Sequence, residues 1–258
     1  MLRIALNGSL GRMGRMVIEA AGQDPEMRVE VLLDRPGHPG IGNRVPTPWG
    51  ELEVRDDPRD IPDVDVAIDF SRPEGSLALA RALAPRRIPL LIGTTGISPS
   101  EREELERLSA DAPILVAGNT SLGVHVTREL ARLARRLLGP EYDAEILEIH
   151  HRHKVDAPSG TALALAEAIG EGREVRRVSG RDGVCGPRSA DEMGVMALRG
   201  GEVVGEHTVF FLGDHDRIEI THRAASRMVL ARGALVLARR LAGRPPGMVE
   251  VGDLWELG

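Results

Sequence analysis

LRIALNGSLGRMG, residues 2–14, joins an apolar run to three glycines with the spacing GxxGxxG. Gly8, Gly11 and Gly14 allow the backbone to turn tightly and to approach a pyrophosphate, and the start of the following helix offers unpaired N–H groups. Asp34 stands twenty residues after Gly14, where an acid at the end of a second strand binds ribose hydroxyls. This spacing predicts a dinucleotide site at the end of the first strand.

Short apolar runs alternate with longer amphipathic runs through the first two-thirds of the chain, as in βα units on a parallel sheet. Five runs are typical of buried strands: Leu2–Leu6, Val29–Leu33, Val64–Asp69, Pro89–Ile92 and Ile114–Ala117. Three runs between them are typical of helices: Gly11–Gly22, Glu74–Ala84 and Pro99–Ser109. The pattern predicts an α/β fold with a Rossmann-type doubly wound parallel sheet.

The pattern changes after a long amphipathic helix predicted over Leu122–Leu138. Its polar face carries four arginines that we expect to be solvated: Arg128, Arg132, Arg135 and Arg136. The strand-like runs that follow are Asp143–His150, Val175–Ser179, Val195–Arg199, Val203–Leu212 and Arg217–Thr221, and the helix-like runs are Thr161–Ile169 and Arg227–Leu241. We expect Gly200-Gly201 to close a hairpin, and we interpret His207 as structural or as a subunit contact. These runs predict a second domain of α+β type.

Small or polar residues also follow other predicted strands. Because the carboxyl ends of parallel strands meet at one crevice, Gly93-Thr94-Thr95-Gly96 and Ala117-Gly118-Asn119-Thr120 are expected to converge with the glycine loop on a nucleotide. Asp69-Phe70-Ser71 is a further member of this set. Arg35, beside Asp34, can instead receive the 2′-phosphate of NADP, so the pair leaves NADH and NADPH both open.

Charge and composition exclude several classes of partner. The 258 residues carry a net charge of −6, and the few aromatic residues never interleave with basic runs, so nucleic acid is not expected. No apolar run approaches the roughly 20 residues that span a bilayer, and one cysteine, Cys185, forms no internal disulfide, so we expect a cytoplasmic protein without membrane contact.

Lys154 is the only lysine among 33 basic residues. Because an ammonium, unlike a guanidinium, can give up a proton, this exception indicates acid–base or Schiff-base chemistry.

HHRHKVDAPSGTA, residues 150–162, is the densest cluster of chemistry-bearing residues. Histidines and the lysine follow a predicted strand, and Ser159-Gly160-Thr161 opens a helix whose hydroxyls and N–H groups suit a carboxylate or phosphate. Imidazole and ammonium groups exchange protons near neutral pH, so the cluster suits reduction of an anionic C=N or C=C substrate.

A metal site is the competing interpretation of these histidines. On a strand only His151 and His153 share a face, and Lys154 would repel a divalent ion, so no metal is expected.

HHRHKVDAPSGTA resembles the signature of the dihydrodipicolinate (4-hydroxy-tetrahydrodipicolinate) reductase family, as do GSLGRMG, IDFSRPEG, IGTTG and RGGEVVGEHT in the same order along the chain. The resemblance implies a dinucleotide-binding domain, residues 1–121 plus 227–258, and a substrate-binding and tetramerisation domain, residues 122–226. It implies NADPH or NADH as cofactor, a small dicarboxylate as substrate and a homotetramer. The implied reaction reduces 4-hydroxy-tetrahydrodipicolinate to tetrahydrodipicolinate with loss of water, in lysine biosynthesis via diaminopimelate.

The same resemblance implies roles for individual residues. His150 would be the general acid/base, Lys154 a proton donor and His151 a substrate contact, while Gly160 and Thr161 would hold a substrate carboxylate. The implied cofactor contacts are Gly8, Ser9, Leu10, Gly11, Arg12, Met13, Asp34, Arg35, Gly93, Thr94, Thr95, Ala117, Gly118, Asn119 and Thr120.

Two other functions fit parts of the sequence. Another two-domain NAD(P)-dependent amino-acid dehydrogenase would explain the N-terminal half equally well, but it gives no reason for HHRHKVDAPSGT. A non-catalytic NAD(P)H-sensing protein would make His150 and Lys154 dispensable.

Overall fold

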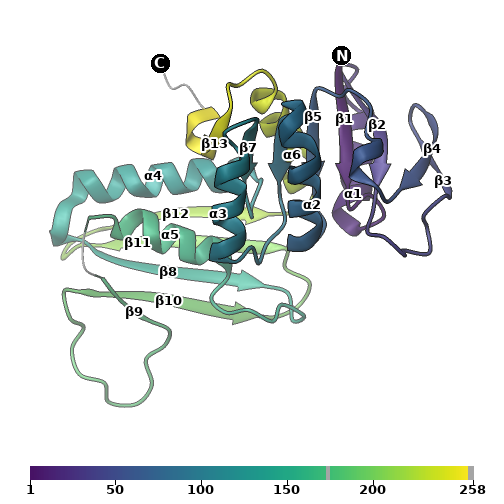
Figure 1. The fold of residues 1–258 in the computed structure, drawn as a ribbon. Coiled ribbons are helices and arrows are strands. Elements are labelled where there is room, and N and C mark those ends of the chain that lie inside the picture. Colours follow the sequence, from purple (N-terminus) through teal and green to yellow (C-terminus); the bar gives the residue numbers. More distant parts are fainter. Residues whose placement is uncertain (173–174, 255–258) are drawn as a thin grey trace. The chain divides into compact units, whose positions relative to one another are not determined.

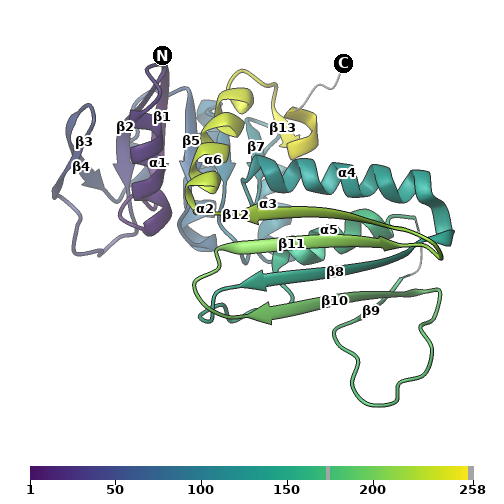
Figure 2. The ribbon, with the colours of Figure 1, turned by 180° about the vertical axis from the view of Figure 1, so that it is seen from behind.

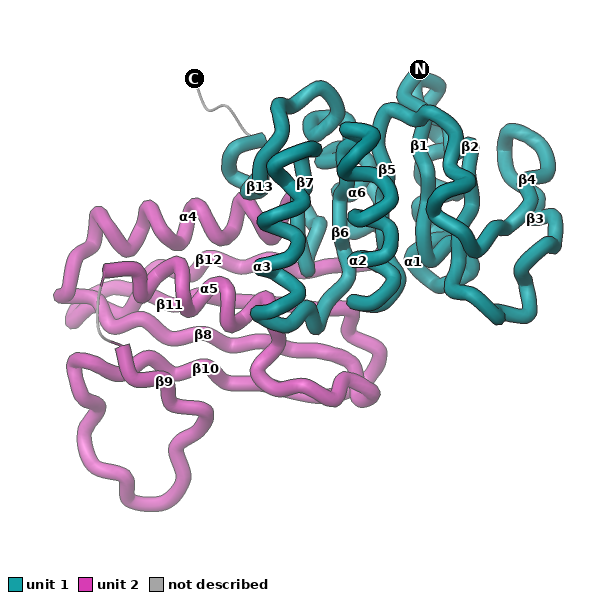
Figure 3. Tube along the Cα trace, viewed as in Figure 1, with its two compact units in different colours: residues 1–121, 228–258 teal, residues 122–227 magenta. Residues whose placement is uncertain are grey.

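The computed structural model describes residues 1–172 and 175–254, and the chain divides into two compact units (Figure 3). Unit 1 comprises residues 1–121 and 228–258, and unit 2 comprises residues 122–227. The domain that we expected to resume at residue 227 includes residues 255–258, which lie outside the described residues. No helix in the described ranges is long and apolar enough to cross a membrane.

Unit 1 is built on an eight-stranded sheet with the order β13-β7-β6-β5-β1-β2-β4-β3 (Figure 1). The strands are β1 (Leu2–Asn7), β2 (Met27–Leu33), β3 (Arg44–Thr47), β4 (Gly50–Arg55), β5 (Val66–Asp69), β6 (Leu90–Ile92), β7 (Pro113–Val116) and β13 (Gly247–Val249). Neighbouring strands are parallel except in the β3–β4 hairpin. Because β2 and β5 flank β1 on opposite sides, the strand order reverses at β1, where α/β sheets bind ligands.

Helices cover both faces of this sheet, which makes it the predicted doubly wound α/β fold. Helices α2 (Pro73–Leu83) and α3 (Pro99–Leu108) lie over the face seen in Figure 1, and α1 (Arg12–Gly22) and α6 (Met228–Leu241) lie over the face seen in Figure 2. Strands β5 and β6 are buried at every position, as expected for parallel strands covered on both faces. Short 3₁₀ turns complete the unit at Pro58–Asp60, Ala84–Arg86 and Val251–Leu254.

Unit 2 is built on a five-stranded mixed sheet with the order β12-β11-β8-β10-β9. Its strands are β8 (Asp143–His150), β9 (Arg176–Val178), β10 (Glu192–Arg199), β11 (Gly205–Leu212) and β12 (Arg217–Ala224). Helices α4 (Leu122–Leu138) and α5 (Gly160–Gly170) pack on one face, and the 3₁₀ turn Gly139–Glu141 follows α4. Figure 2 shows the other face, which the two helices leave open. The core between sheet and helices contains Ile146, Val209 and Phe211 from the strands and Leu165 and Ile169 from α5.

The expected hairpin at Gly200-Gly201 is wrong. β8 lies between β10 and β11, parallel to the first and antiparallel to the second, so the connection passes over the end of β8. There it contacts the residues after β8: the N–H of Gly200 donates to the carbonyl of His150 at 3.0 Å, and the N–H of Arg152 donates to the carbonyl of Gly201 at 3.2 Å. The two glycines therefore support the histidine-rich turn.

The expected solvation of the arginine face of α4 is also wrong in large part. The side chains of Arg128 and Arg132 are only 28% and 35% exposed, and both pair with Glu129. The most exposed side of the helix is instead apolar: Val126, Leu130, Leu133 and Leu137 are 42–78% exposed. The apolar arc of α4 is wider than the surface on which the helix packs, and helical periodicity alone does not say which part of that arc is covered.

Candidate active site

The glycine loop of unit 1 packs so closely against its surroundings that side chains have no room. Gly8 has a φ of +74°, and a Cβ on it would lie 2.3 Å from the carbonyl oxygen of Phe70. A Cβ on Gly14 would lie 2.4 Å from the carbonyl oxygen of Gly8. Gly11 is the N-cap of α1 and, having no side chain, offers no cap to the first-turn N–H groups. This geometry favours an anion at the start of α1.

Asp34, directly after β2, holds the glycine loop in place. Its carboxylate accepts the N–H of Leu10 at 3.0 Å and the N–H of Arg35 at 2.9 Å. These residues line a hollow of about 530 Å³, within the range of small-ligand sites, and His38 and Arg72 complete its polar wall. The hollow thus combines an acid for ribose hydroxyls with two exposed guanidinium groups that suit phosphates.

A buried hydroxyl also fits a dinucleotide in this loop. Ser9 is 2% exposed, and its Oγ has no hydrogen-bond partner in the described part of the chain. A buried hydroxyl without a partner is costly, so a ligand oxygen at the glycine loop would stabilise it. The donor set of the loop therefore fits a pyrophosphate.

Asp69 does not face this hollow, contrary to the expectation that it joins the nucleotide set. Its fully buried carboxylate accepts hydrogen bonds from Asn7 (2.7 Å), Ser71 (2.6 Å), Ser76 (2.5 Å) and Thr94 (2.7 Å). Burial raises the pKa of Asp69, and the four donors offset part of that effect. Asp69 therefore ties together the end of β1, helix α2 and the loops after β5 and β6, while the next two residues, Phe70 and Ser71, line the hollow.

A second hollow of unit 1, about 500 Å³, lies at the loops after β6 and β7. The predicted cofactor residues that line it are Thr94, Thr95 and Gly118. The next loop residues make contacts of their own. Asn119 Oδ1 accepts the N–H of Ser121 at 2.9 Å, and Thr120 Oγ1 donates to the carbonyl of Leu230 in α6 at 2.7 Å. Helix α6 thus fixes this loop.

The predicted cofactor residues lie in loops at the carboxyl ends of the strands, except Arg12 and Met13, which begin α1, and only some of them line the two hollows. Those lining the first are Gly8, Leu10, Gly11, Asp34 and Arg35. Those that line neither are Ser9, Arg12, Met13, Gly93, Ala117, Asn119 and Thr120.

In unit 2, strand β8 ends in a buried carboxyl–imidazole pair. Glu148 is fully buried, His150 is 8% exposed, and Glu148 Oε2 hydrogen-bonds His150 Nδ1. Arg199 of β10 donates to both carboxylate oxygens, at 2.9 and 3.0 Å, and the N–H of Ser159 donates to Oε1 at 3.0 Å. Burial alone would raise the pKa of Glu148, but the hydrogen bonds from Arg199, His150 and Ser159 hold it below its usual range.

His150 lies beside a second buried histidine. Burial lowers the pKa of His150, and the hydrogen bond and charge of Glu148 offset part of that effect. The ring of His207 is edge-on to that of His150, and the two ring centroids are 5.1 Å apart. His207 Nε2 lies 3.2 Å from Ser159 Oγ. Burial, and to a smaller extent the charge of His150, lowers the pKa of His207 to about 4. A Cβ on Gly205 would lie 3.0 Å from His150 Nε2, so the glycine leaves room at that nitrogen.

Lys154 lies in the turn after β8. Its Nζ donates to both carboxylate oxygens of Asp156, at 2.8 and 3.0 Å, and this hydrogen bond holds the pKa of Asp156 below its usual range. The N–H of Lys154 donates to the carbonyl of His151 at 3.1 Å, which closes the turn. His151 is half-buried and its ring lies 6.1 Å from that of His153.

Helix α5 begins directly after this turn. Ser159 caps it by accepting the N–H of Ala162 on Oγ at 3.2 Å. Gly160 is exposed, a Cβ on it would meet nothing within 4 Å, and Thr161 follows in the first turn. The positive end of the helix dipole is therefore open to an anion at Gly160.

Comparison with known proteins agrees with this geometry. The family profiles "Dihydrodipicolinate reductase, N-terminus" and "Dihydrodipicolinate reductase, C-terminus" match residues 2–120 and 123–255. Proteins named 4-hydroxy-tetrahydrodipicolinate reductase from Nitrosospira multiformis and Aromatoleum aromaticum are 43% and 45% identical, over 98% of this chain and 97% and 95% of theirs. The chain belongs to the dihydrodipicolinate reductase family. A dipicolinate-bound dihydrodipicolinate reductase from Paenisporosarcina sp. TG-14 has the same fold, with a TM-score of 0.77, 22% identity and 97% of each chain covered.

Sequence reasoning missed part of the site in this member of the family. The sequence gives no role to Glu148 or Arg199, and it does not indicate that His207 lies against His150. A signal was present in β8, where alternation places Glu148 and His150 on the same face as the buried Ala144 and Ile146. Two polar residues at inward-facing positions of a strand require partners, but the sequence does not name them.

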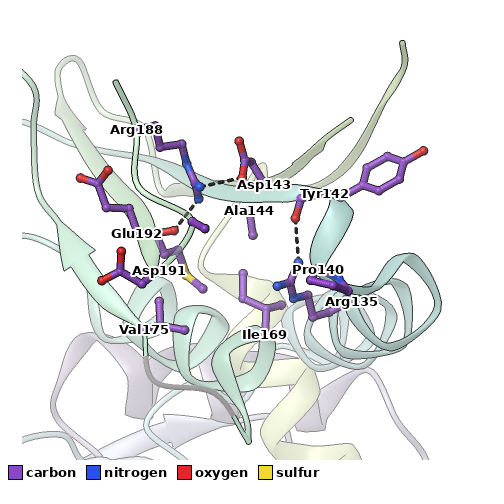
Figure 4. A pocket seen from close by; sticks show the side chains of 12 residues that line it. Arg135, Pro140, Tyr142, Asp143, Ala144, Ile169, Val175, Arg188, Asp191 and Glu192 are labelled. Carbon is purple, nitrogen blue, oxygen red and sulfur yellow. Dashed lines mark hydrogen bonds and ion pairs between the residues drawn. The ribbon is translucent and has the colours of Figure 1, made fainter. Parts of the chain in front are cut away.

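Another hollow of unit 2 lies at the opposite end of β8 (Figure 4). It measures about 390 Å³, and its apolar floor includes Ile169 and Val175. Its cations already have partners: Arg188 Nη1 donates to Asp143 at 2.6 Å, and Arg135 Nη1 donates to the carbonyl of Tyr142 at 2.7 Å. We therefore assign no role to it.

Proposed function

We propose that the protein catalyses NAD(P)H-dependent reduction of 4-hydroxy-tetrahydrodipicolinate to tetrahydrodipicolinate with loss of water, in lysine biosynthesis via diaminopimelate. Membership of the reductase family supports this activity. The observation that carries it is the buried His150, braced by Glu148 on one side, next to the open N-terminus of α5. An acid–base group beside an anion site suits a dicarboxylate whose reduction consumes a proton. We also propose that the protein is cytoplasmic, because its one cysteine, Cys185, is a free and exposed thiol, which suits a reducing compartment.

We assign the chemical roles in unit 2 as follows. The N–H groups of Gly160 and Thr161 bind a substrate carboxylate at the helix start. His150 takes up and returns a proton at Nε2, the ring nitrogen that does not face Glu148, and His151 contacts the substrate. Lys154, held by Asp156, donates the proton that neutralises the reduced product.

The cofactor is held in unit 1. The glycine loop and the start of α1 bind the pyrophosphate, Asp34 or Arg35 meets the adenosine ribose, and the loops after β6 and β7 hold the remaining half. When bound, the reduced nicotinamide supplies a hydride. Ser9 and Gly8 support this assignment, because the buried hydroxyl of Ser9 has no partner among the described residues and Gly8 leaves no space for a side chain.

The decisive experiment supplies purified protein with freshly generated 4-hydroxy-tetrahydrodipicolinate and follows the loss of NADPH or NADH absorbance. We expect oxidation that depends on both substrate and protein. Oxidation with amino-acid or keto-acid substrates alone would favour the amino-acid dehydrogenase alternative. Tight NAD(P)H binding without any turnover would favour a sensing protein, and either result would overturn the proposal.

Cofactor preference depends on Asp34 and Arg35. In Asp34→Ala, the negative charge beside the ribose is lost, and we expect kcat/KM for NADPH relative to NADH to rise about tenfold. Arg35→Ala is the matched variant, because it removes the cation that receives a 2′-phosphate, and the ratio is expected to fall. Steady-state kinetics with both nucleotides measure the ratio. An unchanged ratio in both variants would remove the pair from this role.

We propose that the chain assembles into a homotetramer through the open face of the unit 2 sheet. Leu198 is 51% exposed on that face and lies opposite Ile149 of β8, and Met196 lies opposite Leu147. Such an uncovered apolar face favours burial against a second copy. We expect Leu198→Asp to lower the mass measured by light scattering after gel filtration. Val184→Asp is the control, because Val184 is an apolar residue in an exposed loop. A mass equal to that of one chain for the unmodified protein would contradict the proposal.

A further inference from the structure

We propose that Glu148 is a positioning residue for His150: with Arg199, it fixes the imidazole so that Nδ1 is a donor and Nε2 is the atom presented to substrate. The inference rests on the proposed function, in which His150 is the acid–base group. It adds a buried carboxylate and a partly buried guanidinium to the groups that support the reaction.

The hydrogen-bond geometry decides which nitrogen of His150 carries hydrogen. Arg199 donates to both oxygens of Glu148, at 2.9 and 3.0 Å, and the N–H of Ser159 donates to one of them. A carboxylate that accepts three such bonds stays ionised, and an ionised carboxylate has no hydrogen to donate. His150 Nδ1 must therefore be the donor to Glu148, which leaves the lone pair of the neutral ring on Nε2.

The charges around His150 give Glu148 a second effect. Among the groups acting on His150 in the described ranges, Glu148 is the one that raises its pKa, whereas Lys154 in the turn and Arg199 on β10 lower it. His207 on β11 faces the same ring and is neutral at pH 7 because burial lowers its pKa to about 4. Glu148 thus offsets part of the lowering of the His150 pKa by burial and by the two cations, and it keeps proton exchange at His150 closer to neutral pH.

Arg199 links this carboxylate to the turn that carries Lys154. Besides its two bonds to Glu148, its Nη2 donates to the backbone carbonyl of Asp156 at 2.6 Å, and Asp156 binds the ammonium of Lys154. One side chain therefore fixes the supports of both proposed proton-transfer groups. Without Arg199, Glu148 would be a buried carboxylate that is short of donors.

The test is an NMR titration of the His150 imidazole in the intact protein, combined with the pH dependence of kcat. In Glu148→Gln we expect the pKa of His150 to fall by about one unit or more and the corresponding limb of the kcat profile to move to lower pH. We expect kcat at neutral pH to fall by about 10- to 100-fold with little change in KM. A residue needed only for folding would lower activity at all pH values without moving the limb.

Two further variants complete the design. Glu145→Gln removes the same charge from the same strand but on the sheet's other face, and it should leave the titration of His150 unchanged. Arg199→Gln should shift the pKa of His150 upward, because it removes a positive charge. If Glu148→Gln does not fold, the titration of Arg199→Gln is the test of the inference. An unmoved pKa in folded Glu148→Gln, or no rise in Arg199→Gln, would overturn the inference. Because the titration needs no substrate, this failure is distinct from failure of the proposed reaction.

Discussion

Replacing Lys154 by Arg is expected to lower kcat by about 10²- to 10⁴-fold, the range for losing a positioned proton-transfer group. The substitution keeps the positive charge, and a guanidinium can still pair with Asp156, whose carboxylate now binds the ammonium at 2.8 and 3.0 Å. A guanidinium does not give up a proton at neutral pH, so the turn would be retained and the chemistry lost. Steady-state kinetics with saturating cofactor measure the effect.

A reciprocal change two residues earlier provides the control. Arg152 is exposed in the same turn, and Arg152→Lys introduces an ammonium where no proton transfer is proposed. We expect its turnover to be near normal. If Lys154→Arg also turned over near normally, Lys154 would act as a charge alone, and the fact that it is the only lysine in the chain would carry no chemical meaning.

The parallel core of unit 1 could be predicted because its strands and helices have strong local signals. The apolar run before Gly8 is buried over its last four positions, and Ser98 begins α3 with a capping box to Glu101, as the Ser-Pro and Glu spacing indicates. Strand β13, three residues long in a segment rich in Gly and Pro, was not predicted, because three residues show no periodicity.

Pairing between distant segments could not be predicted. Gly200-Gly201 suggests a hairpin because it is a turn signal between two strand-like runs, although β8 lies between the two strands. The same limit applies to the site. His150 and Lys154 share one short motif, but the contact of Arg199 with Glu148 joins residues 51 positions apart on separate strands. Asp69 is a similar case, since its four partners come from β1, from α2 and from the loops after β5 and β6.

Gly205→Val is expected to lower kcat/KM by about 10²-fold or more, because it fills the space at the proposed proton-transfer atom. A Cβ on Gly205 would lie 3.0 Å from His150 Nε2 and 3.4 Å from its Cδ2, where a hydrogen-bond partner of that nitrogen would otherwise approach. Glu148 holds the ring through Nδ1, so the imidazole cannot turn away without breaking a buried hydrogen bond. Valine suits a strand, and Gly205 is the first residue of β11, so we expect the variant to fold.

Gly200→Val, in the connection that leads to β11, is the matched control, because a Cβ at Gly200 would meet no described residue within 4 Å. We expect it to keep near-normal kinetics, and thermal unfolding of both variants separates blocked chemistry from lost stability. In Gly205→Val the added side chain also removes water from Nε2, so the NMR titration should give a pKa for His150 below that of the unmodified protein. Near-normal kcat/KM in a folded Gly205→Val protein would mean that Nε2 of His150 does not meet the substrate, and the proton-transfer role would then rest on Lys154 alone.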